Sequence, residues 1–266
     1  MMNEIERFAR VGERAAQEAG EYLMSQFRKV RSVAHKGEID LVTDADIVAE
    51  QLIISRLSRE FPDHRFLAEE GHSQAAPGGH TWIIDPLDGT TNYAHGLPIF
   101  SVSLALEIAG IVEWGVVVCP CQQETFIARR GGGAFLNGTP IRVSATAELG
   151  ASLLATGFPY DIRTSACNNL DYFRRFALRA LAIRRMGSAA LDLCYVAAGR
   201  FDGFWELKLH PWDVAAGYLV VREAGGKVTN FRGEEGSIYE TECVASNARI
   251  HEQMLAVIRD GSGAVD

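Results

Sequence analysis

The sequence lacks three features that would each define a class of protein. No apolar run among its 266 residues approaches the roughly 20 residues that a membrane-spanning helix needs. The first residues, MMNEIER, contain acidic side chains and no apolar segment, so we expect neither a signal peptide nor a membrane location. With 26 Lys and Arg against 34 Asp and Glu, the formal charge of −8 argues against a broad basic surface for nucleic acid.

Cysteine is scarce and unpatterned. The five cysteines are an odd number, and the nearest two, Cys119 and Cys121, lie one residue too close for a C-x-x-C motif. Free thiols are the plain interpretation, so we expect a cytoplasmic protein. The chain shows no internal repeat, low-complexity tract or long linker. We therefore expect residues 1–266 to form one domain, whose approximate halves, 1–150 and 151–266, share a core.

Hydrophobic periodicity predicts helices followed by an antiparallel sheet in the first half. Apolar residues recur every three or four positions in residues 5–27 and again in residues 47–61, which indicates two helices, and Asn3 is a candidate cap of the first. The strand 100–108 alternates apolar and polar residues, which predicts one buried face. The expected strands are 82–84, 100–108, 111–118 and 124–128.

The second half alternates strands with helices, which is typical of an α/β arrangement. We expect strands at 152–156 and 204–206, and helices at 170–183, 189–198, 212–224 and 249–258. The predicted fold class is therefore α/β, with an α+β first half.

One hydrophobic strand runs directly into two carboxylates. In IIDPLDGTTNY, residues 83–93, Asp85 and Asp88 follow two isoleucines, and no Lys or Arg lies between His80 and Phe100. A buried carboxylate costs free energy unless a positive group neutralises it, and a second carboxylate nearby increases that cost. The pattern predicts either a well-solvated turn or a bound cation.

Other acidic residues follow or open predicted elements. Each has a structural explanation by itself: Asp46 follows Thr43 in a helix-capping pattern, Asp213 lies in the first turn of a helix, and Glu69 and Glu70 can be solvated loop acids. Taken together, oxygen donors without clustered His or Cys favour Mg²⁺ or Mn²⁺ over zinc. Carboxylates that converge from separate segments would suit two metal ions and an in-line phosphoryl displacement.

Two other motifs compete for residues 85–92. An EF-hand loop that begins at Asp85 requires Glu at its twelfth position, which here is Gly96. A haloacid-dehalogenase phosphatase presents D-x-D-G-T, whereas Pro86 and Leu87 separate the two aspartates here. Neither motif fits the sequence.

The set of motifs resembles the inositol monophosphatase family. DPLDGTTN (residues 85–92) with Tyr93, and WDVAAG (residues 212–217), look like the two signature motifs of that family. The likeness extends in the expected order through LVTDAD, FLAEEG, GFPYD and GSAALD. The resemblance implies a layered αβαβα sandwich, dependence on Mg²⁺ with Mn²⁺ as a substitute, sensitivity to lithium, and a homodimer.

The resemblance also implies which residues hold metal. Glu69, Asp85 and the main-chain carbonyl of Leu87 would hold a first Mg²⁺. Asp85, Asp88 and Asp213 would hold a second, and there is room for a third, weaker ion near Glu69. The metal ions would activate a water molecule and neutralise charge on the phosphoryl group.

Catalytic and substrate-binding roles follow from the same resemblance. Thr90, hydrogen-bonded to Asp46 and with Glu69 close by, would orient and deprotonate the attacking water. Glu206 would accept hydrogen bonds from the hydroxyls of a sugar alcohol, although a surface acid on an edge strand is its structural alternative. The complete set of expected substrate-binding residues is Gly89, Thr90, Gly187, Ser188, Ala189, Glu206 and Asp213.

These roles define the expected function. The chain would be a Mg²⁺-dependent phosphomonoesterase that hydrolyses myo-inositol 1-phosphate, or a similar polyol or sugar phosphate, by direct attack of water. A fructose-1,6-bisphosphatase or a broad sugar phosphatase is the alternative among enzymes. A regulatory protein that binds a partner on the same fold is the alternative from another class. The expected partners are a small phosphate monoester and a second copy of the chain, with no nucleic acid or membrane.

Overall fold

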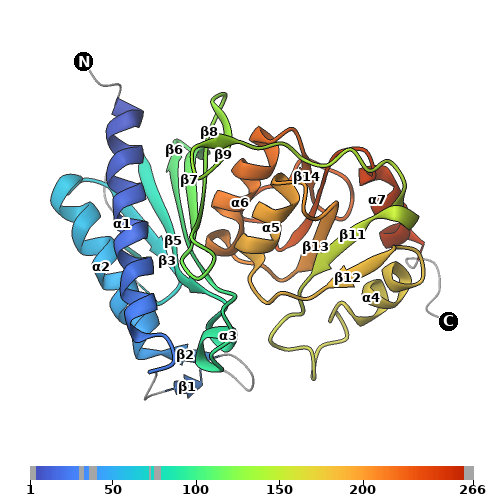
Figure 1. The fold of residues 1–266 in the computed structure, drawn as a ribbon, viewed down its shortest axis with the longest axis horizontal. Helices are drawn as coiled ribbons and strands as arrows, with labels where there is room; N and C mark the ends of the chain where they lie inside the picture. The colour runs from blue at the N-terminus through green and yellow to red at the C-terminus, as the bar shows by residue number, and fades with distance from the viewer. Residues whose placement is uncertain (1–3, 30–32, 36–40, 72, 75–78, 261–266) are drawn as a thin grey trace.

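The computed structural model describes residues 4–29, 33–35, 41–71, 73–74 and 79–260. Five layers stack across the molecule in the order helices, sheet, helices, sheet, helices (Figure 1). The layered αβαβα sandwich implied by the resemblance is therefore confirmed. Asn3, the candidate cap of the first helix, lies outside the described residues. Among the described residues, no helix combines the length and apolarity that a membrane span requires.

The first sheet is largely antiparallel. Only β3 and β5 pair in parallel among its described strands, and every other neighbouring pair is antiparallel. Turns at residues 130–132 and 137–138 separate its later strands. In order across the sheet, the strands are β10 (Thr139–Pro140), β9 (Gly133–Leu136), β8 (Glu124–Arg129), β7 (Ile111–Cys119), β6 (Ser101–Ile108), β5 (His80–Asp88), β3 (Arg65–Ala68) and β4 (Ser73–Gln74).

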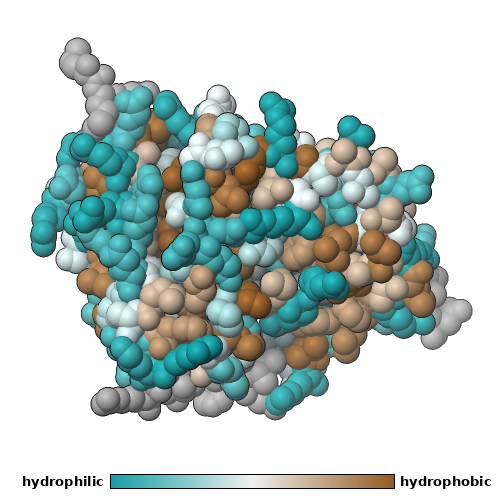
Figure 2. Space-filling model, in the orientation of Figure 1, coloured by the Kyte–Doolittle hydropathy of each residue, from teal (hydrophilic) through white to brown (hydrophobic). Residues whose placement is uncertain are grey.

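Two predicted helices cover the outer face of this sheet. α1 (Glu4–Gln26) buries the expected apolar stripe. α2 (Asp44–Glu60) forms where it was expected, but it leaves Ile47 exposed and buries Asp46 and Glu50 together with its apolar residues. Gly12 of α1 lies against the sheet, where a Cβ atom would come within 2.7 Å of the Trp114 ring. Figure 2 shows hydrophilic side chains over much of the exposed surface of these two helices. A short antiparallel pair, β1 (Val33–His35) and β2 (Leu41–Thr43), precedes α2.

The expectation of a single buried face for residues 100–108 is wrong. Every residue of β6 from Ser101 to Glu107 is buried, because helices pack on both faces of the sheet. α1 covers one face, and α5 (Ala189–Ala197) and α6 (Pro211–Glu223) cover the other (Figure 1). Gly115 of β7 permits the close approach of α6, since a Cβ atom there would lie 2.9 Å from the Cα atom of Ala216.

The second sheet is mixed. β11 pairs in parallel with β12 and β13, whereas β15 is antiparallel to β13 and β14. α5 and α6 separate it from the first sheet, and α4 (Leu170–Ala177) and α7 (His251–Arg259) lie on its outer side (Figure 1). In order, its strands are β12 (Ala182–Arg184), β11 (Leu153–Thr156), β13 (Gly203–Leu207), β15 (Glu242–Ser246) and β14 (Lys227–Thr229).

The structure corrects three sequence expectations. The helix predicted for residues 170–183 ends at Ala177, and residues 182–184 form β12, because they pair with β11 at the edge of the sheet. The strand predicted for residues 82–84 continues to Asp88. β3, β14 and β15 are among the strands that were not expected, since short apolar runs do not distinguish strand from helix or loop.

One apolar core joins the two halves of the chain. Ile83 and Val117 of the first sheet, Phe204 of the second, and Leu191 and Val220 of the intervening helices belong to the same buried cluster. This shared core supports the proposal that the halves form one unit. The same arrangement brings the N-terminal ends of α5 and α6 to the end of β5 that carries the two aspartates.

Candidate active site

Strand β5 delivers Asp85 and Asp88 to the edge of the sandwich. Its pairing with β6 is regular from His80 to Asp85 and then shifts before Asp88. Asp85 is 1% exposed, and its Oδ1 atom accepts a 3.0 Å hydrogen bond from the Leu87 N–H. The two aspartates thus belong to an irregular strand end rather than to a solvated turn. The turn comes one residue later, at Gly89, whose φ of 101° favours glycine.

Asp46 is both a helix cap and a partner of Thr90. Thr43 and Asp46 form the capping box that the sequence indicated at the start of α2. The other oxygen of the carboxylate, Oδ1, accepts a 2.9 Å hydrogen bond from the Thr90 hydroxyl, 44 residues later. Burial raises the pKa of Asp46 above its ordinary value, although these hydrogen bonds oppose the shift.

The start of α5 meets Asp88. The Oδ2 atom of Asp88 accepts a 2.6 Å hydrogen bond from the Ser188 hydroxyl and a 2.8 Å hydrogen bond from the Ala190 N–H. Asn92 anchors the preceding loop, because its side-chain amide donates to the carbonyl of Met186 at 2.8 Å. A negative charge at the N-terminal end of a helix is stabilised by the helix dipole.

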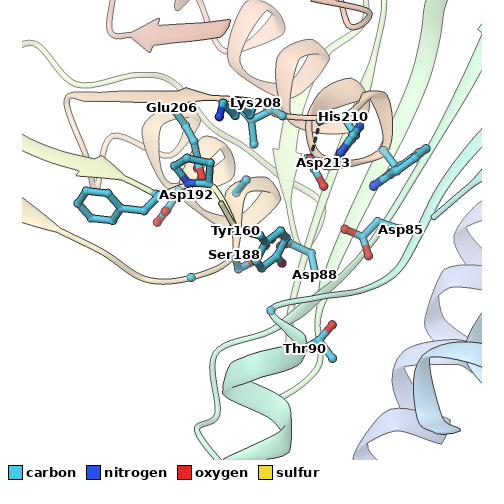
Figure 3. Close-up of a pocket in the computed structure, with 18 of the residues that line it drawn as sticks. Asp85, Asp88, Thr90, Tyr160, Ser188, Asp192, Glu206, Lys208, His210 and Asp213 are labelled. Atoms are coloured by element: carbon cyan, nitrogen blue, oxygen red, sulfur yellow. Dashed lines mark hydrogen bonds between the residues drawn. The ribbon is translucent and has the colours of Figure 1, made fainter. Parts of the chain in front are cut away.

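Asp213 lies in the first turn of α6, so it too is a carboxylate at the N-terminal end of a helix. The helix begins at Pro211, and the Oδ2 atom of Asp213 accepts a 2.7 Å hydrogen bond from the His210 N–H. The His210 and Trp212 rings stack with centroids 4.9 Å apart beside it. Figure 3 shows Asp213, Asp85 and Asp88 around the same space, although they come from α6 and β5.

Glu69 reaches the site through the parallel pairing of β3 with β5. Because both strands run in the same direction, the residue after β3 lies beside the end of β5, and the Glu69 N–H donates to the Ile84 carbonyl at 3.2 Å. Burial raises the pKa of Asp85 well above its ordinary value, and the negative charges of Glu69, Asp88 and Asp213 raise it further.

The aspartates of the site are destabilised as anions. Burial raises the pKa of Asp88 to about 6, despite the hydrogen bonds from Ser188 and Ala190. Withdrawal from water also raises the pKa of Asp213 well above its ordinary value, against the hydrogen bond from His210. A cation among these side chains would relieve both effects.

The carboxylates surround a pocket of about 370 Å³. Asp46 lies behind it and contacts it through Thr90. The other residues that the resemblance implicated all line the pocket; they are Glu69, Asp85, Leu87, Asp88, Gly89, Thr90, Gly187, Ser188, Ala189, Glu206 and Asp213. The structure thus brings together residues from five separate stretches of the chain.

The chemistry of the donors suits a divalent cation, although the side chains are not arranged around one. Among the described residues, no group of three or more His, Cys, Asp or Glu side chains is positioned to hold a metal ion. The carboxylates of Asp85, Asp88 and Asp213 instead accept hydrogen bonds from the protein. Hard oxygen donors with raised pKa values fit Mg²⁺, provided that these side chains reorient to bind it.

Several residues line the pocket in addition to the expected site residues. Arg185 and Asp192 flank the loop and helix start that carry Ser188, and Tyr160 and Lys208 also line the pocket. Arg185 lowers the pKa of Asp88, so it supplies the positive charge that is missing from the sequence around β5. Asp192 stands in the GSAALD motif and Tyr160 in the GFPYD motif, so the sequence offered a signal for both.

Comparisons with known proteins place this chain in a family. The inositol monophosphatase family matches residues 4–262, and the chain belongs to it. The Nus factor SuhB of Pseudomonas aeruginosa is 44% identical over 255 residues, which cover 92% of this chain and 93% of the relative. The inositol-1-monophosphatase of Mesorhizobium japonicum is 42% identical over 248 residues, which cover 92% of this chain and 93% of that one.

A solved structure shares the fold. The inositol monophosphatase of Anabaena (Nostoc) sp. PCC 7120 superimposes with a TM-score of 0.89 at 39% sequence identity, and the match covers 97% of each chain. The chain is thus similar along almost its whole length both to proteins named for inositol monophosphate hydrolysis and to proteins named SuhB.

Proposed function

We propose that this protein is a Mg²⁺-dependent phosphomonoesterase that hydrolyses myo-inositol 1-phosphate or a similar polyol phosphate. The proposal rests on the composition of one pocket, which is lined by Asp85, Asp88 and Asp213. The same pocket is lined by Thr90, whose hydroxyl is hydrogen-bonded to the buried Asp46, and by Glu206. The part of the pocket around the three aspartates suits cations with a phosphate, and the part around Glu206 suits hydroxyl groups. The family to which the chain belongs supports this function.

The metal ligands are proposed from the donors that surround the pocket. Glu69, Asp85 and the carbonyl of Leu87 would hold one Mg²⁺, and Asp85, Asp88 and Asp213 a second. Bound Mg²⁺ would supply positive charge for the phosphoryl group and a water molecule with a lowered pKa. The third ion, lithium sensitivity and the homodimer stay predictions.

The Thr90–Asp46 pair provides a path for a proton. The Thr90 hydroxyl donates to Oδ1 of Asp46 at 2.9 Å, which leaves the lone pairs of its oxygen to accept a proton from the attacking water. The raised pKa of Asp46 makes its carboxylate a better base than an exposed aspartate. This pair would orient the water and remove its proton, with Glu69 beside it.

The remaining residues would hold the substrate. Gly89 has no side chain, so a phosphate can approach the start of α3 (Thr90–Ala94), and a Cβ atom there would lie 3.0 Å from the Ile99 carbonyl. Ser188 and Ala189 form the wall beside Asp88, and Glu206 would accept hydrogen bonds from the leaving alcohol. Direct attack of water fits better than a phosphorylated aspartate, because Asp85 and Asp88 would both be engaged as metal ligands.

A substrate panel tests this proposal. Phosphate release would be measured with myo-inositol 1-phosphate, fructose 1,6-bisphosphate, histidinol phosphate and 3′-phosphoadenosine 5′-phosphate, each with and without Mg²⁺. We expect Mg²⁺-dependent turnover with the highest kcat/KM for the inositol ester. Equal rates on all four would indicate a generalist, and a preference for the bisphosphate would favour a fructose-1,6-bisphosphatase.

The name of the Pseudomonas aeruginosa relative favours a second candidate, in which this chain acts as a Nus factor. The reaction is proposed for the cytoplasm, and the five cysteines are free. Complementation separates the two candidates. If Asp88→Asn, without turnover, restores growth to a strain that lacks the gene, a binding role is the one that the cell requires.

A further inference from the structure

The end of the pocket remote from Thr90 contains a second buried acid. Asp192 lies one turn into α5 and is 1% exposed, yet it lines the pocket together with Glu206. Figure 3 shows Asp192 beside Glu206, on the side of the pocket away from Asp85. Its position on α5 keeps it separate from Asp88, which meets the first turn of the same helix.

Neither acid receives a side-chain hydrogen bond from the part of the chain that the structure describes. The Oδ1 atom of Asp192 is buried without a partner among the described residues. Within the same part of the chain, no hydrogen bond reaches the carboxylate of Glu206, and Arg185 forms no ion pair with either acid. Asp202, a buried acid nearby in sequence, differs: it accepts hydrogen bonds from the Ser144 hydroxyl at 2.5 Å and from the Leu153 N–H at 2.7 Å.

A buried carboxyl group without a donor costs free energy and is uncommon in folded proteins. The cost is offset when a ligand supplies the missing donors. A phosphate cannot do so, because it is itself an acceptor and negatively charged. A polyol can, since each hydroxyl group carries a proton.

We propose that Asp192 and Glu206 together bind neighbouring hydroxyl groups of the substrate alcohol, so that Asp192 is a specificity-determining residue. The inference rests on the proposed phosphomonoesterase function and adds to it a second carboxyl group, that of Asp192, which recognises the leaving alcohol. A substrate with two or more hydroxyls within reach of both carboxyls would be preferred over an ester with none.

The surroundings of the pair support this role. Gly157 leaves room for the carboxylate of Glu206, because a Cβ atom on residue 157 would overlap with that carboxylate. Burial raises the pKa of Asp192 well above its ordinary value, and burial raises the pKa of Glu206 to about 8. At neutral pH Glu206 therefore retains its proton, and a protonated carboxyl both donates and accepts, as a hydroxyl does.

The test uses Asp192→Leu, which fills the same space without polar atoms. We expect kcat/KM for myo-inositol 1-phosphate to fall about 10- to 100-fold, mainly through KM, while p-nitrophenyl phosphate, which has no hydroxyl group, changes less than about threefold. Because the buried oxygen has no protein partner, the Tm of the variant should equal or exceed that of the wild type. Equal losses on both esters, or a fall in Tm with no change in selectivity, would overturn the inference.

A binding measurement separates this inference from the proposed function. Free myo-inositol, with Mg²⁺ present, should raise the Tm of the wild type but not that of Asp192→Leu. Asp202→Asn is the control, since it weakens a buried acid outside the pocket and should retain the ligand-induced shift. If the wild type hydrolyses neither ester, the proposed function fails. If inositol shifts wild type and Asp192→Leu equally, or shifts neither, Asp192 does not bind the polyol.

Discussion

The Ser188 hydroxyl lies 2.6 Å from Oδ2 of Asp88, and this contact joins the two halves of the chain at the site. The Ala190 N–H donates to the same oxygen at 2.8 Å. An acid from the end of a strand in the first half thus meets the start of a helix from the second half. The position of α5 therefore controls the geometry of Asp88.

Asp88→Asn should abolish turnover without unfolding the protein. The substitution removes one negative ligand for the proposed cation and also removes repulsion from the other acids, so metal-free Tm should stay equal or rise slightly. We expect kcat at saturating Mg²⁺ to fall at least about 1,000-fold. Steady-state kinetics together with thermal unfolding check both points, and a kcat near that of wild type would refute the metal assignment.

Thr90→Val should lower kcat by about 100- to 10,000-fold and leave KM almost unchanged. Valine preserves the shape of threonine but cannot bond the Oδ1 atom of Asp46, so the path for the proton is lost. Thr90→Ser retains the hydroxyl and is the matched control, with activity within about tenfold of wild type. If Val and Ser variants were equally active, the hydroxyl would have no part in the reaction.

Metal-free protein should become less stable as the pH rises above 4.5. The pKa of Glu206 is raised from 4.5 to about 8, so between these values the folded state holds a proton that the unfolded state has released. The free energy of unfolding then falls with increasing pH, by at most about 1.4 kcal/mol for each pH unit from this group. Urea unfolding of wild type and Glu206→Gln checks this.

Glu206→Gln carries no titrating group at this position, so its unfolding free energy should depend less steeply on pH between 4.5 and 8. Parallel curves for the two proteins would show that Glu206 ionises normally in the folded state.

Gly115→Val should destabilise the fold by about 1–3 kcal/mol, because a Cβ atom there comes within 2.9 Å of the Ala216 Cα atom and pushes α6 away from β7. Since Asp213 is on α6, kcat/KM should fall as well. Gly79→Ala is the control, because no atom of the described residues lies within 4 Å of a Cβ at that position. Chemical denaturation and kinetics on both variants test the effect; an unchanged Gly115→Val protein would contradict the tight packing.

The longest helices and the central strands β6, β7 and β8 of the first sheet could be predicted because their apolar residues repeat over many positions. α1, α2 and α6 begin and end within a few residues of their expected limits. The capping box of Thr43 and Asp46 was visible for the same reason, since its partners are three residues apart. These features depend on interactions between near neighbours, which a sequence displays directly.

Tertiary structure decided what depends on contacts between distant segments. Residues 182–184 form a strand because β11 is available to pair with them, and β6 is buried on both faces because α5 and α6 return to cover it. Asp192 and Glu206 likewise come to line the same pocket only when α5 packs beside β13. Short segments carry too few local interactions to fix their own conformation, so long-range packing determines them.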